Sequence, residues 1–283
     1  MDVVHEIAGM QRRAAEARLA RKTIAVVPTM GALHAGHAAL IREARSRADL
    51  VITTVFVNPT QFGPGEDFAR YPRSPERDAL CAAEAGSDIL FAPEGAAMYP
   101  AGYSTFVEVA GITDVLEGRA RPGHFRGVAT IVAKLFLITS PHIAVFGQKD
   151  AQQVAVIRRL IADLNYPIDL IVVPIVRDAD GVALSSRNAY LTPAQRREAT
   201  VLHRSLQRAE ACVREGERDS AAVIAEMRSL IAGGSGGDVE YISIADAATL
   251  QEQAAIRTGT TILISLAVRF GHTRLIDNCI VEV

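Results

Sequence analysis

Cysteine is scarce in this chain of 283 residues, with only Cys81, Cys212 and Cys279, which lie far apart. No Cys-x-x-Cys pair and no cluster of cysteine with histidine occurs, which argues against a disulfide framework and against a zinc site. No pair of carboxylates is spaced for a dedicated metal cage either. We therefore expect reduced thiols, a cytoplasmic location and no metal site built by the protein alone.

An excess of positive charge and a long apolar run are also missing. The 30 basic and 32 acidic residues give a net charge of −2, which argues against a broad electrostatic grip on nucleic acid but leaves room for a local basic pocket. No segment approaches the ~20 apolar residues of a membrane helix, and the nearest candidate, IVAKLFLI, carries Lys134. Residues 1–22 contain no uninterrupted apolar segment of signal-peptide length, and we expect an amphipathic helix there.

The first 176 residues alternate between short apolar runs and helical patterns. One expected helix is 74–86, where Ser74 fits the N-cap, Pro75 the first helical position and Gly86 the position after the last turn. Such alternation predicts an α/β domain over residues 1–176, a Rossmann-like parallel sheet with helices on both faces. The expected strands are 23–27, 50–57, 88–92, 142–147 and 168–176, and the other expected helices are 37–48, 127–139 and 150–164.

The pattern changes after residue 176. Two helices are expected at about 193–215 and 219–232, followed by a flexible Gly/Ser turn at 233–238. The remaining segments VEYISIAD, TTILISLAVRF and TRLIDNCIVEV are typical of strands joined by short loops. We therefore expect a smaller α+β domain over residues 177–283.

The stretch VVPTMGALHAGHAAL follows the first expected strand and leads into a helix. Backbone N–H groups and the positive end of the helix dipole gather at a helix N-terminus, which favours anions. Gly31 and Gly36 would let a phosphate approach the backbone, and His34 and His37, one turn apart, can face one ligand. Imidazoles donate hydrogen bonds without a full fixed charge and can follow charge that develops in a transition state. The alternative is that both histidines only cap the helix.

Within this stretch HAGH matches the HxGH signature of the nucleotidylyltransferase superfamily, and the longer PTMGALHAGH resembles the pantoate–β-alanine ligases, or pantothenate synthetases. Four further segments are similar to that family: FVNPTQF, RPGHFRGV, FGQKDAQQ and LSSRNAYL. These motifs extend from Pro28 to Leu191, whereas the tail matches only in general pattern. The resemblance implies ATP-dependent condensation of pantoate with β-alanine through a pantoyl adenylate, with release of AMP and pyrophosphate.

The same resemblance implies the roles of individual residues. Lys149, after an expected strand, would act as a point charge on the α-phosphate, and Arg187 would offer a planar fork of donors to phosphate oxygens. Catalytic roles are expected for His34, His37, Lys149 and Arg187. The expected ATP-binding residues are Met30, Gly31, His34, Gly36, His37, Gly147, Lys149, Asp150, Val176, Leu184, Ser185, Ser186 and Arg187. The expected pantoate-binding residues are Asn58, Gln61, Arg121, His124 and Gln153.

Several of these residues have a simpler alternative role. Asn58 could only shape a turn, Asp150 could cap the following helix, and Met30 could belong to the core rather than form a pocket wall with Val55. The SSRN segment could be a solvated turn, whereas the resemblance makes it part of a lid formed by the smaller domain. Position 148 is Gln where the family is expected to have Glu more often, which puts a charge role at that position in doubt.

The resemblance also implies the partners. ATP, pantoate and β-alanine are the expected substrates, and Mg²⁺ is expected to arrive on the ATP phosphates. A homodimer through the N-terminal domain is expected, with neither nucleic acid nor a membrane as partner. A plain nucleotidylyltransferase that stops after AMP transfer and a tRNA-binding module on the same fold are the alternatives. The leading interpretation requires the two imidazoles and the Lys149 ammonium to meet at one triphosphate.

Overall fold

The computed structural model describes all of residues 1–283, which divide into two compact units. Unit 1 consists of residues 1–148 and 156–174, and unit 2 consists of residues 149–155 and 175–283. The helix α7 (Ala151–Asp163) contributes residues to both units. None of the helices combines the length and the apolar composition that crossing a membrane requires.

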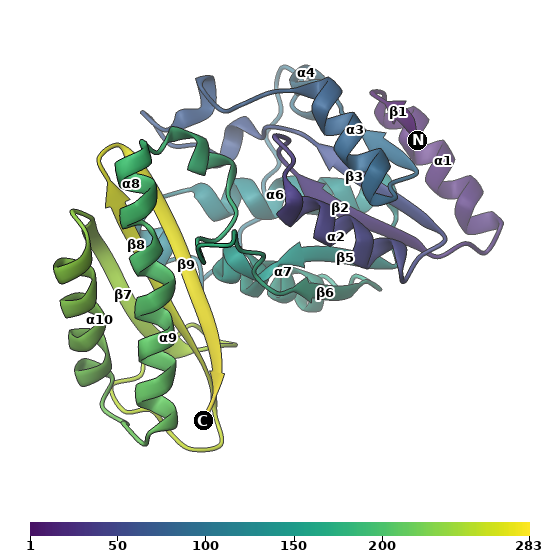
Figure 1. Cartoon of the computed structure of the whole chain (residues 1–283). Coiled ribbons are helices and arrows are strands. Elements are labelled where there is room, and N and C mark those ends of the chain that lie inside the picture. The colour runs from purple at the N-terminus through teal and green to yellow at the C-terminus, as the bar shows by residue number, and fades with distance from the viewer. The chain divides into compact units, whose positions relative to one another are not determined.

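Unit 1 is built on a sheet of six parallel strands in the order β1-β4-β3-β2-β5-β6 (Figure 1). From β2 the chain adds β3 and β4 on one side and later adds β5 and β6 on the other. The direction of winding therefore reverses between β2 and β5, and such a switch point is where α/β sheets bind ligands. The strands are β1 Asp2–Val4, β2 Ile24–Thr29, β3 Leu50–Val55, β4 Ile89–Phe91, β5 Ile143–Gly147 and β6 Asp169–Val173.

Helices flank this sheet, as the alternating pattern predicts (Figure 1). α2 and α3 bury Ile41 and Ala82 against Val27 and Val51 of the strands, while α1 and α6 pack together and also contact β2. The predicted parallel α/β architecture is confirmed. The remaining helices of unit 1 are α1 Ile7–Leu19, α2 Ala35–Arg45, α3 Pro75–Ala85, α4 Gly95–Met98, α5 Leu116–Ala120 and α6 His124–Thr139, with 3₁₀ turns η1 Pro59–Gln61 and η2 Asp67–Ala69.

Three details differ from the sequence-based expectation. Ser74 occupies the expected N-cap position of α3, but its side chain makes no capping hydrogen bond. Residues 1–22 do not form one helix as expected, because Asp2–Val4 is the strand β1 and only Ile7–Leu19 is helical; three residues are too few to show a strand periodicity. The helix α6 begins at His124, after Gly123 with a φ of +82°, three residues before the expected start.

Unit 2 carries an antiparallel sheet in the order β7-β8-β9, with α9 and α10 packed together against it (Figure 1). Leu206, Met227 and Ile264 belong to the aliphatic core of this α+β unit. The helix expected at 193–215 is two helices that meet at the fully buried Ala199, and the Gly/Ser turn is short because α10 continues through Gly234. The elements are η4 Ser186–Tyr190, α8 Pro193–Glu198, α9 Thr200–Arg214, α10 Ser220–Gly234, β7 Asp238–Asp246, β8 Thr261–Phe270 and β9 Thr273–Glu282.

Candidate active site

The loop between β2 and α2 leaves the sheet at the carboxyl end of a central strand. The Thr29 hydroxyl donates to the Thr54 carbonyl (2.6 Å) and accepts from the Gly31 N–H (3.2 Å), which fixes the start of the loop. Gly31 has a φ of +85°, and a Cβ there would lie 2.9 Å from Asp78 Oδ2 and 3.0 Å from Val55 Cγ1. Glycine is therefore required at position 31 by the backbone conformation and by the lack of space.

A buried carboxylate holds the same loop. Asp78, in the first turn of α3 and only 2% exposed, accepts from the Ala32 N–H (3.0 Å) and the Leu33 N–H (2.7 Å). Ala32 has a φ of +50°, which is uncommon for a residue with a side chain, and these hydrogen bonds help to hold it there. Sequence reasoning misses Asp78, because an acidic residue in a first helical turn is ordinarily explained by the helix dipole.

His34 and His37 cap the N-terminus of α2 reciprocally. His34 Nδ1 accepts from the Gly36 N–H (3.1 Å), and His37 Nδ1 accepts from the His34 N–H (3.3 Å). The ring centroids are 4.1 Å apart. Because a nitrogen that accepts a hydrogen bond carries the lone pair, each neutral ring holds its proton on Nε2. The two rings therefore cap the helix through Nδ1, and each carries its N–H donor on Nε2.

Asn58 and Gln61 lie at the turn η1 after β3, and both side chains are buried. The Asn58 amide donates to Gln61 Oε1 (3.1 Å) and to the Gly127 carbonyl (3.1 Å), and its oxygen accepts from the Thr60 hydroxyl (2.9 Å). Gln61 Nε2 lies 2.8 Å from Met30 Sδ. Asn58 therefore shapes the turn, and the turn brings Gln61 against the histidine loop.

Arg121 and His124 hold the same turn from the start of α6. His124 Nδ1 donates to the Gln61 carbonyl (2.8 Å), and His124 Nε2 accepts from Arg121 Nη1 (3.1 Å). Arg121 also forms a bidentate ion pair with Glu66 (2.8 and 2.6 Å). Burial and the neighbouring Arg121 charge lower the pKa of His124 to about 4, so its ring is neutral near pH 7. Burial raises the pKa of Glu66, but the hydrogen bonds and charge of Arg121 outweigh it, and the pKa is lowered overall.

Two further residues that sequence reasoning misses, Gly127 and Tyr99, also contact the turn η1 and Asn58. A Cβ on Gly127 would lie 2.7 Å from Gln61 Cα, so only glycine lets α6 approach the η1 backbone. The Tyr99 hydroxyl donates to Asn58 Oδ1 (2.9 Å). A glycine inside an apolar helical pattern is the one sequence signal for such close packing.

In unit 2 the expected ATP-binding residues between Val176 and Arg187 lie on a hairpin and on the turn that follows it. The Leu184 N–H donates to the Val176 carbonyl (3.0 Å) and closes the hairpin. The Ser185 hydroxyl then accepts from the Arg187 N–H (3.3 Å) at the start of η4. Ser185 therefore shapes the turn that carries Ser186 and Arg187.

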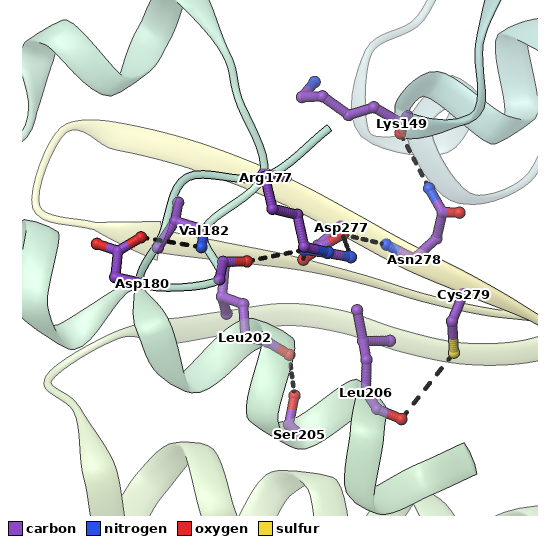
Figure 2. Close-up of polar contacts among 12 residues, drawn as sticks. Lys149, Arg177, Asp180, Val182, Leu202, Ser205, Leu206, Asp277, Asn278 and Cys279 are labelled. Atoms are coloured by element: carbon purple, nitrogen blue, oxygen red, sulfur yellow. Dashed lines mark hydrogen bonds and ion pairs between the residues drawn. The ribbon is translucent and has the colours of Figure 1, made fainter. Parts of the chain in front are cut away.

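Lys149 lies in the 3₁₀ turn η3 (Gln148–Asp150), directly after β5. Its ammonium is 3.3 Å from Asp150 Oδ1, and its side chain is 21% exposed. Its backbone carbonyl accepts from the side chain of Asn278 (3.0 Å), as Figure 2 shows. Gln153 is half-buried in the first turn of α7.

The expected site residues thus fall into two groups, one in each unit. In unit 1 the contact between Met30 and Gln61 joins the histidine loop to the group of Asn58, Arg121 and His124, and Gly147 ends the strand next to β2. In unit 2 the hairpin, η4 and Lys149 form the second group. Nowhere do three His, Cys, Asp or Glu side chains gather as a metal site would require. Action of both groups on one ligand stays a prediction.

Three comparisons with known proteins agree. A profile of the family described as Pantoate-beta-alanine ligase matches residues 2–280. The whole chain is 52% identical to a pantothenate synthetase of Moorella thermoacetica, of which it covers 99%. The crystal structure of pantothenate synthetase from Thermus thermophilus matches with a TM-score of 0.91 and 44% identity over 99% of both chains. The pantoate-beta-alanine ligase from Francisella tularensis, crystallised with beta-gamma ATP and beta-alanine, matches with a TM-score of 0.79 and 33% identity over 99% of this chain and 97% of that one.

Proposed function

The chain belongs to the pantoate–β-alanine ligase family, and we propose that it activates pantoate with ATP to pantoyl adenylate and then joins the pantoyl group to β-alanine. The observation that carries this proposal is the reciprocal histidine cap, which presents two Nε2–H donors at the start of α2. The ATP and β-alanine bound to the Francisella tularensis enzyme support the choice of substrates.

Activation is needed because a carboxylate is a poor electrophile. In the first step a pantoate carboxylate oxygen attacks the α-phosphorus of ATP, and the bond between the α-phosphorus and the bridging oxygen breaks to release pyrophosphate. In the second step the neutral amine of β-alanine attacks the acyl carbon, AMP leaves with the bonding electron pair, and the amine proton passes to solvent. The protein must hold a polyanion, orient pantoate and keep water from the mixed anhydride.

The histidine loop is suited to the first of these steps. The Nε2–H groups of His34 and His37 would donate to phosphate oxygens as negative charge grows there, and the positive end of the α2 dipole would add to the effect. Gly31 lets the backbone of the loop lie close to the phosphates, since no side chain covers it.

Unit 2 would supply the cations. Lys149 and Arg187 would stabilise charge on the α-phosphate and the leaving pyrophosphate, with Ser185 and Ser186 donating hydroxyls. Asp150 would bind the ribose, and backbone groups of Val176 and Leu184 would border the nucleotide. Mg²⁺ would enter with ATP as part of that substrate, bound mainly by phosphate oxygens and water.

Pantoate would be oriented by amides. Gln61 and Gln153 can each donate to and accept from the hydroxyls and carboxylate of pantoate. Arg121 and His124 would act on pantoate chiefly through Gln61, because His124 already donates to the Gln61 carbonyl and Arg121 is paired with Glu66.

Isotope exchange between pyrophosphate and ATP tests the proposal. Exchange should require pantoate and proceed without β-alanine, and adding β-alanine should release one AMP for each pantothenate formed. Exchange without pantoate, or AMP transfer that β-alanine does not resolve into pantothenate, would favour the plain nucleotidylyltransferase instead. If the protein retains tRNA on a filter but forms no detectable pantothenate at the same protein concentration, the tRNA-binding module is favoured.

The family resemblance also leads us to propose a homodimer through the N-terminal domain. Sedimentation equilibrium should then give about twice the 30.3 kDa of one chain. A mass of one chain at micromolar concentration would contradict the dimer without touching the proposed reaction.

A further inference from the structure

Two adjacent polar residues of β9 lie outside the five motifs that resemble the ligase family, which end at Leu191. Asp277 and Asn278 are each 3% exposed, although they carry a carboxylate and an amide. Burial of such groups is unfavourable unless they are hydrogen-bonded, so their partners show what they hold. Those partners include Lys149 and the hairpin that leads to Ser185 (Figure 2).

Asn278 holds the backbone of Lys149. Its Nδ2 donates to the Lys149 carbonyl over 3.0 Å, across 129 positions of the sequence. This hydrogen bond fixes the backbone from which the lysine side chain extends. It therefore restricts where the Lys149 ammonium can reach, without contacting the ammonium directly.

Asp277 holds the hairpin. Its two oxygens accept from Arg177 Nη1 (2.6 Å) and Nη2 (2.9 Å), and Arg177 Nη1 also donates to the Gly181 carbonyl at the hairpin turn (3.1 Å). The Asp277 carboxylate accepts in addition from the Asn278 N–H (2.8 Å), which links the two side chains. A buried bidentate pair of this kind fixes geometry as well as adding energy.

The strand also packs against η4, the turn that carries Ser186 and Arg187. The strand β9 therefore contacts three parts of unit 2: the Lys149 backbone through Asn278, the hairpin from Val176 to Leu184 through Asp277, and η4. All three contain residues that the proposed function assigns to ATP. Simple core packing would not require polar groups at this point, since aliphatic residues fill the neighbouring core.

We infer that Asp277 and Asn278 are positioning residues, which set the Lys149 backbone and the hairpin before η4 in the geometry required for adenylate formation. The inference rests on the proposed function for its effect on rate. The restraint of the Lys149 segment is an independent consequence and can be measured without any substrate.

The test compares Asn278→Ala with Ser265→Ala. Ser265 lies opposite Asn278 in the β8–β9 register, is similarly buried, and its hydroxyl has no hydrogen-bond partner. Asn278→Ala should lower kcat for pyrophosphate–ATP exchange about tenfold, with the KM of pantoate within about twofold, since only an interaction that serves the transition state is lost. Ser265→Ala should stay within about twofold of the wild type in both quantities.

Two further measurements separate positioning from loss of stability. In hydrogen exchange without ligand, Asn278→Ala should speed exchange in residues 148–155 and leave α10 unchanged, whereas general destabilisation would speed both. In a Lys149→Ala background, Asn278→Ala should have little further effect, because residues that act as a unit are not additive. Asp277→Asn, which keeps the shape but removes the charge, should speed exchange in residues 176–190.

Unchanged kcat and unchanged hydrogen exchange of residues 148–155 in Asn278→Ala would overturn the inference. So would an equal factor of decrease in kcat from Asn278→Ala in the wild-type and Lys149→Ala backgrounds. If Asn278→Ala does not fold, Asn278→Ser retains a donor of smaller reach and should show an intermediate loss. If Asn278→Ala speeds hydrogen exchange at residues 148–155 but the wild-type protein makes no pantothenate, the proposed function is refuted. The restraint of the Lys149 segment by Asn278 would still stand.

Discussion

At the scale of single residues, the two imidazoles at the start of α2 serve the backbone and the proposed chemistry with different nitrogens. Nδ1 caps the helix in both rings, and Nε2 carries the donor that the reaction would use. This division allows the structural role and the chemical role of one histidine to be separated by the choice of substitution.

His34→Asn and His34→Ala should therefore differ in stability but not in activity. Asparagine is a strong N-cap residue, so it should preserve the helix start, whereas alanine should lower the free energy of unfolding by about 1 kcal/mol. Both should slow pyrophosphate–ATP exchange by about 10²–10³, the effect of removing one transition-state donor. Urea denaturation and the exchange assay measure the two quantities. Unchanged exchange in His34→Ala would exclude the catalytic role.

The lowered pKa of His124 predicts that the free energy of unfolding decreases as the pH falls. Its pKa is about 4 when folded against 6.5 for the ordinary side chain, so the unfolded chain binds a proton that the folded protein does not. Between pH 7 and pH 5 this linkage should remove about 2 kcal/mol of unfolding free energy. Glu66 contributes little in that window, because its pKa is lowered from 4.5 and the protonation of its carboxyl in the unfolded chain occurs mostly below pH 5.

The matched control for this pH dependence is His124→Gln. The glutamine amide can donate to the Gln61 carbonyl and accept from Arg121 as the imidazole does, but it does not titrate. The variant should show a shallower decline in urea stability from pH 7 to pH 5. His142 and His203, whose pKa values burial also lowers, are present in both proteins and cancel in the comparison. Equal slopes would show that His124 is not the titrating group.

The sequence predicts residues that belong to contiguous motifs better than residues that act across the chain. His34, Gly31 and Gln61 stand within short motifs whose chemistry is local. Asp78 and Asn278 act through hydrogen bonds to loops 45 and 129 positions away, respectively, and no periodicity or spacing marks such pairings. These two residues follow only from the fold.

At the scale of elements, the close approach of α6 to the turn η1 depends on one glycine. Gly127→Ala would place a Cβ 2.6 Å from the Thr60 carbonyl carbon and 2.7 Å from Gln61 Cα. Because both neighbours are backbone atoms, the helix or the turn has to move. We expect a loss of about 1–3 kcal/mol in stability and a higher KM for pantoate, since Gln61 is displaced.

Gly95→Ala in α4 is the control for this substitution. A Cβ at Gly95 meets nothing within 4 Å, so stability should be unchanged or slightly higher there. Thermal unfolding and the pantoate KM should be measured for both variants. A Gly127→Ala protein with unchanged Tm and KM would show that the approach of α6 to η1 does not position Gln61.

The elements that the sequence predicts well are those with a strong local pattern. The central strands β2, β3, β4 and β5 are mostly buried, and the alternation of such apolar runs with helices predicted the architecture. The order β1-β4-β3-β2-β5-β6 was not predicted, because it depends on pairing between distant strands. The division into α8 and α9 was also missed, since the residues on both sides of Ala199 favour helix and Ala199 itself keeps helical dihedral angles (φ −60°, ψ −18°).

At the scale of the whole molecule, the residues proposed to bind ATP come from both compact units. His34 and His37 belong to unit 1, and Lys149, Ser185 and Arg187 belong to unit 2. The family motifs predict this combination, but no sequence pattern predicts how the two compact units are held during catalysis. The test must therefore observe both units with one ligand.

Hydrogen exchange measured over a series of MgATP concentrations provides that test. If both groups bind the same nucleotide, peptides covering residues 31–38 and 184–190 should become protected with the same midpoint. His34→Asn, which keeps the α2 cap, should then shift both midpoints to higher ATP concentration by the same factor, because a single binding equilibrium governs both segments. The α10 peptide should show no change and serves as the internal control. Protection at 184–190 whose midpoint is unmoved by His34→Asn would mean that unit 2 binds nucleotide independently, and the proposed site would then have to be confined to one unit.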